Sequence, residues 1–419
     1  MSNTSARRRE FGAYLACLRR HSGRSQRQFA AALCAVFGAQ SITRHEVSRW
    51  ERGERVPDAW LSAFAQVLGT PLHELEQAAA YARGDGQAAL PGVASTLADL
   101  LPGGMDVLEP LTTPCGRRIG ATTVAALAAR VHGLRLADDV LSGGDLIVPA
   151  FRELRAAIRL YRESEHSEET GRGLLVQIGE LGQIAGWIAS DAGRGKDAER
   201  AYRLGISAAR QTGDAVLVAQ LAGSLGYHLS NSDRPREGLE LSRAAVAEAG
   251  QDAPAATRAL FLDRVAWAHT RVGESQPALR ALGQAHAALD STNSPPAPSW
   301  AYWVNRDELE VMDARVFTEL RRPLRAVPLL RDVLGRYEAT HAREVALYRS
   351  WLAVALADAN EPEQAAEEAR RVIDTSGDLS SERTAQRART VLHRLKEHEN
   401  VPEAREVLAD HGHLLLTRP

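Results

Sequence analysis

The feature that most constrains the fold is a pattern of helix pairs that recurs about every forty residues over the later part of the chain. In each pair a short turn is followed by a small residue, and these small residues are Ala198, Gly238, Ala278, Ala326, Ala365 and Ala404, at spacings of 40, 40, 48, 39 and 39. Twelve residues before the first five of them stand Gly186, Gly226, Ala266, Ala314 and Ala353. Small residues at both sites let two helices approach closely, so each pair can bury its apolar face on the next pair.

These helix pairs resemble a tetratricopeptide repeat (TPR) array with stretched repeats. A TPR repeats about every 34 residues, and Gly182 stands where the family has a Trp early in its first helix. We therefore expect a TPR-like α-solenoid over residues 119–419, with regular repeats over about 174–378 and a C-terminal cap at 384–416. A non-repetitive helical bundle is the alternative.

The first part of the chain has a different sequence pattern. Residues 7–82 alternate short helical patterns with capping and turn residues, and residues 83–118 are rich in Pro and Gly and are predicted to form a linker. We find no convincing strand alternation after residue 119. The chain is thus expected to be all-α, with a five-helix head, a linker and a solenoid body.

Charge is distributed unevenly between these parts. The first 56 residues hold eleven Arg, no Lys and four Glu, a net charge of +7, and since the whole chain carries −2 the remainder carries −9. A basic head on an acidic body is expected when one end binds a polyanion. An Arg-rich surface that is only solvated is the alternative. Of the 51 basic residues only Lys196 and Lys396 are lysines, a bias typical of GC-rich coding as in actinobacteria.

The composition favours a protein of the cytoplasm. No apolar stretch is long enough to span a membrane, and the basic residues near the start are followed by no apolar segment of a signal peptide. The three Cys are scattered, as expected of free thiols in a reducing compartment. We find no spacing typical of a nucleophile elbow, a metalloprotease helix or a zinc site, so we expect no enzymatic activity, no cofactor and no metal.

The segment "SITRHEVSRWERGERVP" at 41–57 is the most informative stretch of the head. Thr43 begins a capping box, in which its hydroxyl accepts from the amide of Glu46 and the Glu46 carboxylate reaches back to the Thr43 amide. Ile42 and Val47, on either side of this cap, form a hydrophobic staple. The capping box and the hydrophobic staple therefore both predict that a helix starts after Thr43.

The same segment specifies where this helix ends and which way it faces. Gly53 is placed to adopt a left-handed conformation and Pro57 prevents the helix from resuming, so the helix covers about 44–52. Val47 and Trp50 point into a core. The opposite face carries Arg44, His45, Ser48 and Arg49. An amphipathic helix whose arginines are only solvated would not explain the cap, the staple, the Gly and the Pro together.

Four further helices are indicated around it. "FGAYLACLRR" and "SQRQFAAAL" precede it, "PDAWLSAFAQVLG" follows it, and a last short helix comes after Pro71. In this order the segments resemble the lambda-repressor-like helix-turn-helix of xenobiotic-response-element (XRE) regulators over about residues 10–78. "SRWERGERVP" is among the most specific parts of that pattern. The stretch "CAVFGAQSI" makes the gap between the second and third helices longer than in compact members.

The resemblance implies a set of DNA contacts and one structural pair. The contacts are to phosphate from the start of the second helix (Gln26, Arg27), to base edges from the third helix (Arg44, His45, Arg49, with Ser48 nearby) and to the backbone from the following loop (Arg52, Arg55). Arg19 and Glu51 match a buried ion pair that is structural in the family. An Arg can bond both acceptors on the major-groove edge of guanine, which gives such a helix its ability to discriminate bases.

In the repeats a second candidate site follows the small residue of each first helix. Its rings are Trp187, Tyr227 and Trp267, and its polar members are Gln183, Asn231, Asp263, Arg271 and Arg315. By resemblance to TPR receptors this strip would line a concave face, where rings take side chains and amides bond the backbone of an extended peptide or a small-molecule effector. Packing between repeats is the alternative.

Together these patterns predict a sequence-specific transcription regulator that binds double-stranded DNA. Because one head covers one half-site, we expect a homodimer on a (pseudo)palindromic operator, with a body that mediates dimerisation, senses an effector, or both. The rival hypothesis is a TPR scaffold that captures a partner protein and carries a vestigial DNA-binding head.

Overall fold

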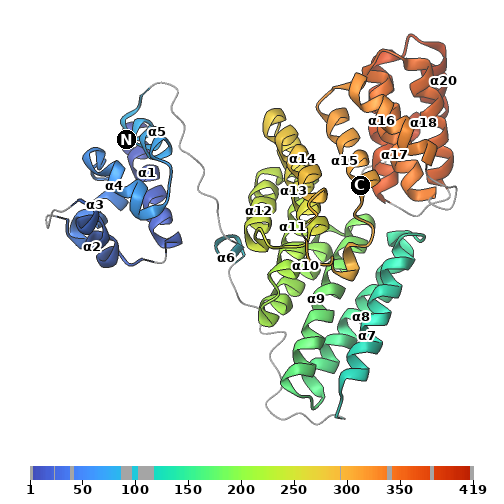
Figure 1. Ribbon diagram of the computed structural model, residues 1–419. Helices are drawn as coiled ribbons and strands as arrows, with labels where there is room; N and C mark the ends of the chain where they lie inside the picture. The colour runs from blue at the N-terminus through green and yellow to red at the C-terminus, as the bar shows by residue number, and fades with distance from the viewer. Residues whose placement is uncertain are drawn as a thin grey trace. The chain divides into compact units, whose positions relative to one another are not determined.

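The computed structural model describes residues 3–22, 24–37, 42–85, 97–101, 118–292, 294–336, 342–377 and 382–415. Within these ranges the regular elements are helices, and the all-α fold predicted from the sequence is confirmed (Figure 1). The chain divides into two compact units, Met1–Ala94 and Ser95–Pro419, which we call the head and the body. Among the described helices, none is both long enough and apolar enough to cross a membrane.

The described residues of the head form the five α-helices that the sequence predicts, and in addition one short 3-10 turn. They are α1 (Asn3–His21), α2 (Gln26–Phe37), α3 (Arg44–Glu51), η1 (Asp58–Trp60), α4 (Leu61–Leu68) and α5 (Leu72–Arg83). Phe64 of α4 lies at the centre of the core, edge-on to Phe29 of α2 at 5.2 Å and to Trp50 of α3 at 5.5 Å between ring centroids. Such edge-to-face pairs stabilise beyond the area that they bury. The aromatic core therefore fixes the inner face of α3.

Reciprocal capping occurs in the head, but at α2. The Ser25 amide donates to the Gln28 side-chain oxygen at 2.9 Å, and the Gln28 amide donates to the Ser25 hydroxyl at 3.3 Å. At α3 only half of the predicted box forms, because Thr43 accepts from the Glu46 amide at 3.4 Å while the Glu46 carboxylate accepts from Arg49. The Glu46 carboxylate bonds to Arg49 because a charged guanidinium is a stronger donor than the neutral Thr43 amide. The half of the box in which Glu46 reaches back to Thr43 was therefore predicted wrongly.

Both ends of α3 are held against the rest of the head. Ile42 and Val47, the predicted staple, are buried in the head core. Gly53 after the helix has φ +70°, and a Cβ at this position would clash with the Arg8 carbonyl oxygen in α1. Gly53 thus provides both the left-handed turn and the close approach of α1.

The connection between α2 and α3 is shorter than the sequence suggests, because α2 extends into it. The first residues of "CAVFGAQSI" continue α2 as far as Phe37, and residues 38–41 lie outside the described residues.

The body is built of successive helices from α6 onward. They are α6 (Leu97–Leu100), α7 (Ala121–Asp138), α8 (Gly143–Glu163), α9 (Glu168–Asp191), α10 (Gly195–Thr212), α11 (Ala215–Ser230), α12 (Pro235–Ala249), α13 (Ala255–Arg271), α14 (Ser275–Leu289), η3 (Ser299–Ala301), α15 (Arg306–Glu319), α16 (Pro323–Arg336), α17 (Ala342–Asp358), α18 (Pro362–Gly377), α19 (Glu382–Leu395), η4 (Lys396–His398), α20 (Pro402–His411) and η5 (Gly412–Leu415).

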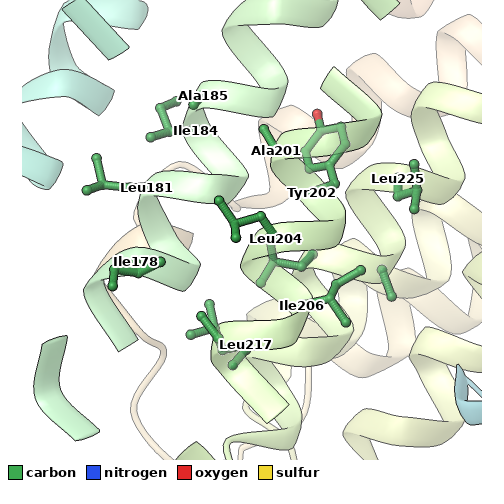
Figure 2. Packing of buried hydrophobic residues seen from close by; sticks show 14 of the residues in the cluster. Ile178, Leu181, Ile184, Ala185, Ala201, Tyr202, Leu204, Ile206, Leu217 and Leu225 are labelled. Carbon is green, nitrogen blue, oxygen red and sulfur yellow. The ribbon is translucent and has the colours of Figure 1, made fainter. Parts of the chain in front are cut away.

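These helices pack as stacked pairs. The most extensive contacts join α9 to α10, α11 to α12 and α13 to α14, and the first helix of each pair also contacts the first helix of the next (Figure 1). The longer spacing of 48 falls where the segment containing η3 separates α14 from α15. Figure 2 shows the apolar side chains between α9, α10 and α11, where Ile178, Tyr202 and Leu217 are buried. Each pair therefore covers the apolar face of its neighbour, as in a solenoid.

Small residues bring the two helices of a pair into backbone contact. A Cβ on Gly226 in α11 would lie 2.9 Å from the Gly238 carbonyl oxygen in α12, and a Cβ on Gly238 would lie 2.6 Å from the Gly226 carbonyl oxygen. These are the paired small residues that the repeat pattern singles out. The close approach predicted for this hairpin is confirmed.

Part of the predicted linker packs on the body. Leu97 and Leu101 are buried in the body core, and the Arg210 guanidinium donates to their two carbonyl oxygens at 3.0 and 2.7 Å. Residues 86–96 and 102–117 of this segment lie outside the described residues.

Substituting Gly226→Ala is expected to lower the free energy of unfolding of the body by about 1–3 kcal/mol, because the added methyl group meets rigid backbone. Gly283→Ala in α14 is the matched control, since a Cβ there has no neighbouring atom within 4 Å. The control should be neutral or stabilise by about 0.5–1 kcal/mol, because Ala loses less conformational entropy than Gly in a helix. Urea denaturation of both variants measures the difference, and equal effects would refute the close-approach role.

Candidate DNA-binding interface

The last residue of α3 lies at the centre of a polar network. Glu51 accepts from Arg19 Nε at 2.5 Å and from Arg19 Nη2 at 3.2 Å, and the two side chains are only 11% and 12% exposed. The side-chain amide of Gln26 donates to the second Glu51 oxygen at 2.6 Å. The pair predicted from the resemblance is therefore present, and it joins α1, α2 and α3 at one carboxylate.

Gln26 has a structural role that the sequence analysis did not assign to it. Its side chain was expected to hold phosphate, and in the structure one of its amide N–H groups donates to Glu51. Arg27, the next residue, is exposed at the start of α2. The phosphate contacts predicted for Gln26 and Arg27 stay predictions.

The outer face of α3 carries the predicted base-reading side chains. Arg44, His45 and Arg49 are exposed, while Val47 and Trp50 on the opposite face are buried. An eight-residue helix fixed on its inner face and at both ends presents its outer side chains from a rigid base. This arrangement suits insertion into a groove that must be read at defined positions.

The loop after α3 adds an acidic residue that the sequence reasoning missed. Glu54 accepts from Arg52 Nε at 2.8 Å and from Arg49 Nε at 3.1 Å, and these hydrogen bonds hold the pKa of its carboxyl below the usual range. Arg52 also donates to the Ser48 hydroxyl at 2.7 Å. The sequence signal for Glu54 was the alternation of charged residues in "ERGER". Glu54 reaches Arg49 because the chain reverses direction at Gly53.

This cluster orients the arginines without burying them. The side chains of Arg49 and Arg52 remain 47% and 59% exposed, and Arg55 in the same loop is exposed as well. Exposed ion pairs of this kind contribute little to stability and are readily exchanged. A DNA phosphate or a guanine edge can therefore replace Glu54 and Glu46 as partners of these guanidinium groups.

In the body, the predicted strip forms a column of rings. Trp187 stacks on Tyr227 at 5.7 Å, Tyr227 lies 6.3 Å from Trp267, and Trp267 meets Trp351 edge-on at 5.7 Å between ring centroids. The Arg315 guanidinium lies 4.6 Å from the Trp267 ring and donates to the Tyr227 hydroxyl at 2.6 Å. Trp351 of α17 was missed because it falls outside the series of rings spaced by 40.

Four of the predicted strip residues are buried rather than open to a ligand. They are Gln183, Asp263, Trp267 and Arg315, with exposures of 7%, 2%, 3% and 5%. The Gln183 amide donates to the Ser224 hydroxyl at 3.4 Å. The prediction of an open groove along these side chains is therefore corrected, since cation–π and ring contacts between repeats fill the space.

The remaining strip residues lie at the edge of the column. Trp187 and Tyr227 are half-buried, while Asn231 and Arg271 are exposed. The Asn231 side-chain oxygen accepts from Trp267 Nε1 at 3.1 Å, and Arg271 pairs with Glu319 at 3.3 Å. These polar groups are partnered within the body and still reachable from its surface.

Asp263 is the most perturbed acid in this region. One of its carboxylate oxygens is buried without a hydrogen-bond partner, and burial raises its pKa to about 7 although the Arg315 charge opposes the shift. The adjacent Arg264 is also buried, which lowers its pKa to about 10, and it donates to the Gln220 side-chain oxygen at 2.9 Å. The column thus carries a carboxyl that is easily protonated.

The comparison with known proteins bears on the head. Residues 10–78 match the sequence model of a helix-turn-helix domain family, a range that extends from α1 into α5. No curated protein matches the chain. The head is therefore a helix-turn-helix domain, and this fold indicates a DNA-binding regulator.

Substituting Glu51→Gln is expected to destabilise the head by about 3 kcal/mol, because it leaves the nearly buried Arg19 charge without its counter-ion. Hydrogen exchange of peptides from α1 to α3 in the full chain measures this loss directly, and Glu76→Gln on the exposed face of α5 is the matched control. Unchanged protection in the Glu51 variant would show that the network does not anchor α3.

Substituting Asp263→Asn is expected to remove a pH dependence of the body's stability. Because the folded-state pKa of Asp263 lies above its unfolded value, the folded state binds the proton more tightly, and stability falls as the pH rises from about 4 to about 7. The difference in unfolding free energy between wild type and variant should therefore change across this range. Parallel stability curves would contradict the assignment.

Proposed function

We propose that the protein is a sequence-specific transcription regulator of the XRE type, and that α3 reads base edges in the major groove of DNA. The observation that carries the proposal is the combination of an outer face bearing Arg44, His45 and Arg49 with an inner face locked to the head core and to Arg19. A helix that only covered a core would not need its exposed arginines on so firmly fixed a frame.

The chemistry of these side chains suits base reading. A guanidinium can donate to both acceptors of guanine, and residues at the start of a recognition helix lie nearest to the base edges. Arg44 and His45 occupy that start. Arg27, Arg52 and Arg55 lie before and after α3 in the sequence and are exposed, so they can bind backbone phosphates and set the register.

We assign dimerisation to the body, which we interpret as TPR-like. Two heads are needed to cover a (pseudo)palindromic operator. Leu136, Val140 and Val148 support this role, because these large apolar side chains are 47%, 66% and 72% exposed near the turn between α7 and α8. We propose these side chains as the contact surface, since large exposed apolar side chains favour contact with another protein surface.

Effector sensing is the second role that we propose for the body. The column is closed at Trp267 and Arg315, so a peptide or small molecule would contact its edge at Asn231 and Arg271. Both side chains are exposed and bonded to the column or its neighbours. Binding there would be transmitted through contacts that join consecutive repeats.

Selection of bound sequences from a random duplex pool by the purified full chain tests the DNA-reading proposal. The selected duplexes should share a motif, and Arg49→Ala should relax the preference at one base pair, at a cost of about 1–3 kcal/mol in binding. Arg172→Ala is the matched control, because this side chain at the start of α9 in the body is 61% exposed. Failure to enrich any motif would favour the scaffold with a vestigial head.

A further inference from the structure

A hollow of about 560 Å³ lies on the head beside the end of α3. Arg8 and Arg9 from the start of α1 line one part of it, and Arg52 and Glu54 from the loop after α3 line another. Thr4 and Ser5, in the first turn of α1, add hydroxyl groups. A space of this size accommodates a phosphodiester group together with several waters of about 30 Å³ each.

The backbone explains why these arginines meet. The loop at Gly53 lies directly on α1, because a Cβ on Gly53 would be 2.7 Å from the Arg9 amide nitrogen. Of the three consecutive arginines in α1, Arg7 is used inside the head, with its guanidinium 5.2 Å from the Tyr81 ring of α5. Arg8 and Arg9 remain exposed beside the loop.

The charge of the hollow favours an anion. Three guanidinium groups face one carboxylate, and that carboxylate, Glu54, is already shared between Arg52 and Arg49. The amides in the first turn of α1 add the positive end of the helix dipole next to Arg8 and Arg9. The hollow therefore has a net positive charge. For phosphate oxygens its guanidinium groups offer paired N–H donors, and the hydroxyls of Thr4 and Ser5 offer single donors.

We propose that this hollow binds a backbone phosphate of duplex DNA, with Arg8 and Arg9 extending the contact surface of α3 and its loop onto α1. The phosphate replaces Glu54 as the partner of Arg52. This inference rests on the proposed DNA-binding function. It adds to that function a backbone contact from an element that the helix-turn-helix pattern did not assign.

Salt dependence of DNA binding tests the proposal, because each neutralised phosphate adds about 0.9 to the slope of log K against log salt. The full chain and its Arg8→Ala/Arg9→Ala variant are titrated onto one short duplex of fixed sequence at several salt concentrations, with fluorescence anisotropy as the readout. The magnitude of the variant's slope should be smaller by about 0.9. Circular dichroism checks that its helix content is unchanged.

Two matched variants separate a local contact from net charge. Arg8→Lys/Arg9→Lys keeps both charges and should retain most of the slope. Arg172→Ala/Arg200→Ala removes two exposed charges from the body and should leave the slope unchanged. If wild type binds and the Arg8→Ala/Arg9→Ala variant has the same slope, the hollow is not a phosphate site and the proposed function stands. If wild type itself binds no duplex at low salt, the proposed function fails and this inference fails with it.

Discussion

The geometry of the head depends on how Glu51 is held. This carboxylate ends α3, where the negative end of the helix dipole disfavours a second negative charge, so it needs donors from elsewhere. Arg19 and Gln26 provide them from two other helices. Because all three groups are largely withdrawn from water, the bonds are directional and hard to exchange. The outer side chains of α3 are therefore presented from a frame that the network and the aromatic core fix together.

A comparable constraint operates in the body through Arg315. Its charge is buried, and burial works against the ionised form, but three rings and a hydroxyl group compensate: Trp267, Trp351 and Tyr227 all lie within 6 Å. These contacts join α11, α13, α15 and α17, the first helices of four consecutive pairs. The column links repeats that would otherwise interact only with their immediate neighbours. One buried cation thus joins four consecutive pairs of the body.

Local rules of helix formation made most of the fold predictable. The staple at Ile42 and the left-handed Gly53 depend on a few adjacent residues, and both are present as expected. The pairing of Gly226 with Gly238 followed from spacing alone, since close helix approach needs small residues at matching heights. These features were accessible because each is specified by a short stretch of sequence.

Partner choice of polar side chains was less predictable. Gln26 donates to Glu51 because α3 brings that carboxylate within reach. Glu46 accepts from Arg49 because this charged donor competes with the backbone amide of Thr43. Arg315 was expected to face a ligand, yet it is enclosed by rings from helices far apart in the chain. Such outcomes depend on tertiary neighbours that no single segment specifies.

The central claim is that the outer face of α3 contacts base edges in the major groove, and methylation interference tests it most directly. Guanine N7 lies in that groove, so methylating single guanines of a selected duplex should abolish binding of the intact chain at a few positions, and Arg49→Ala should lose sensitivity at one of them. Binding that tolerates N7 methylation at every guanine of a guanine-containing motif would contradict the account.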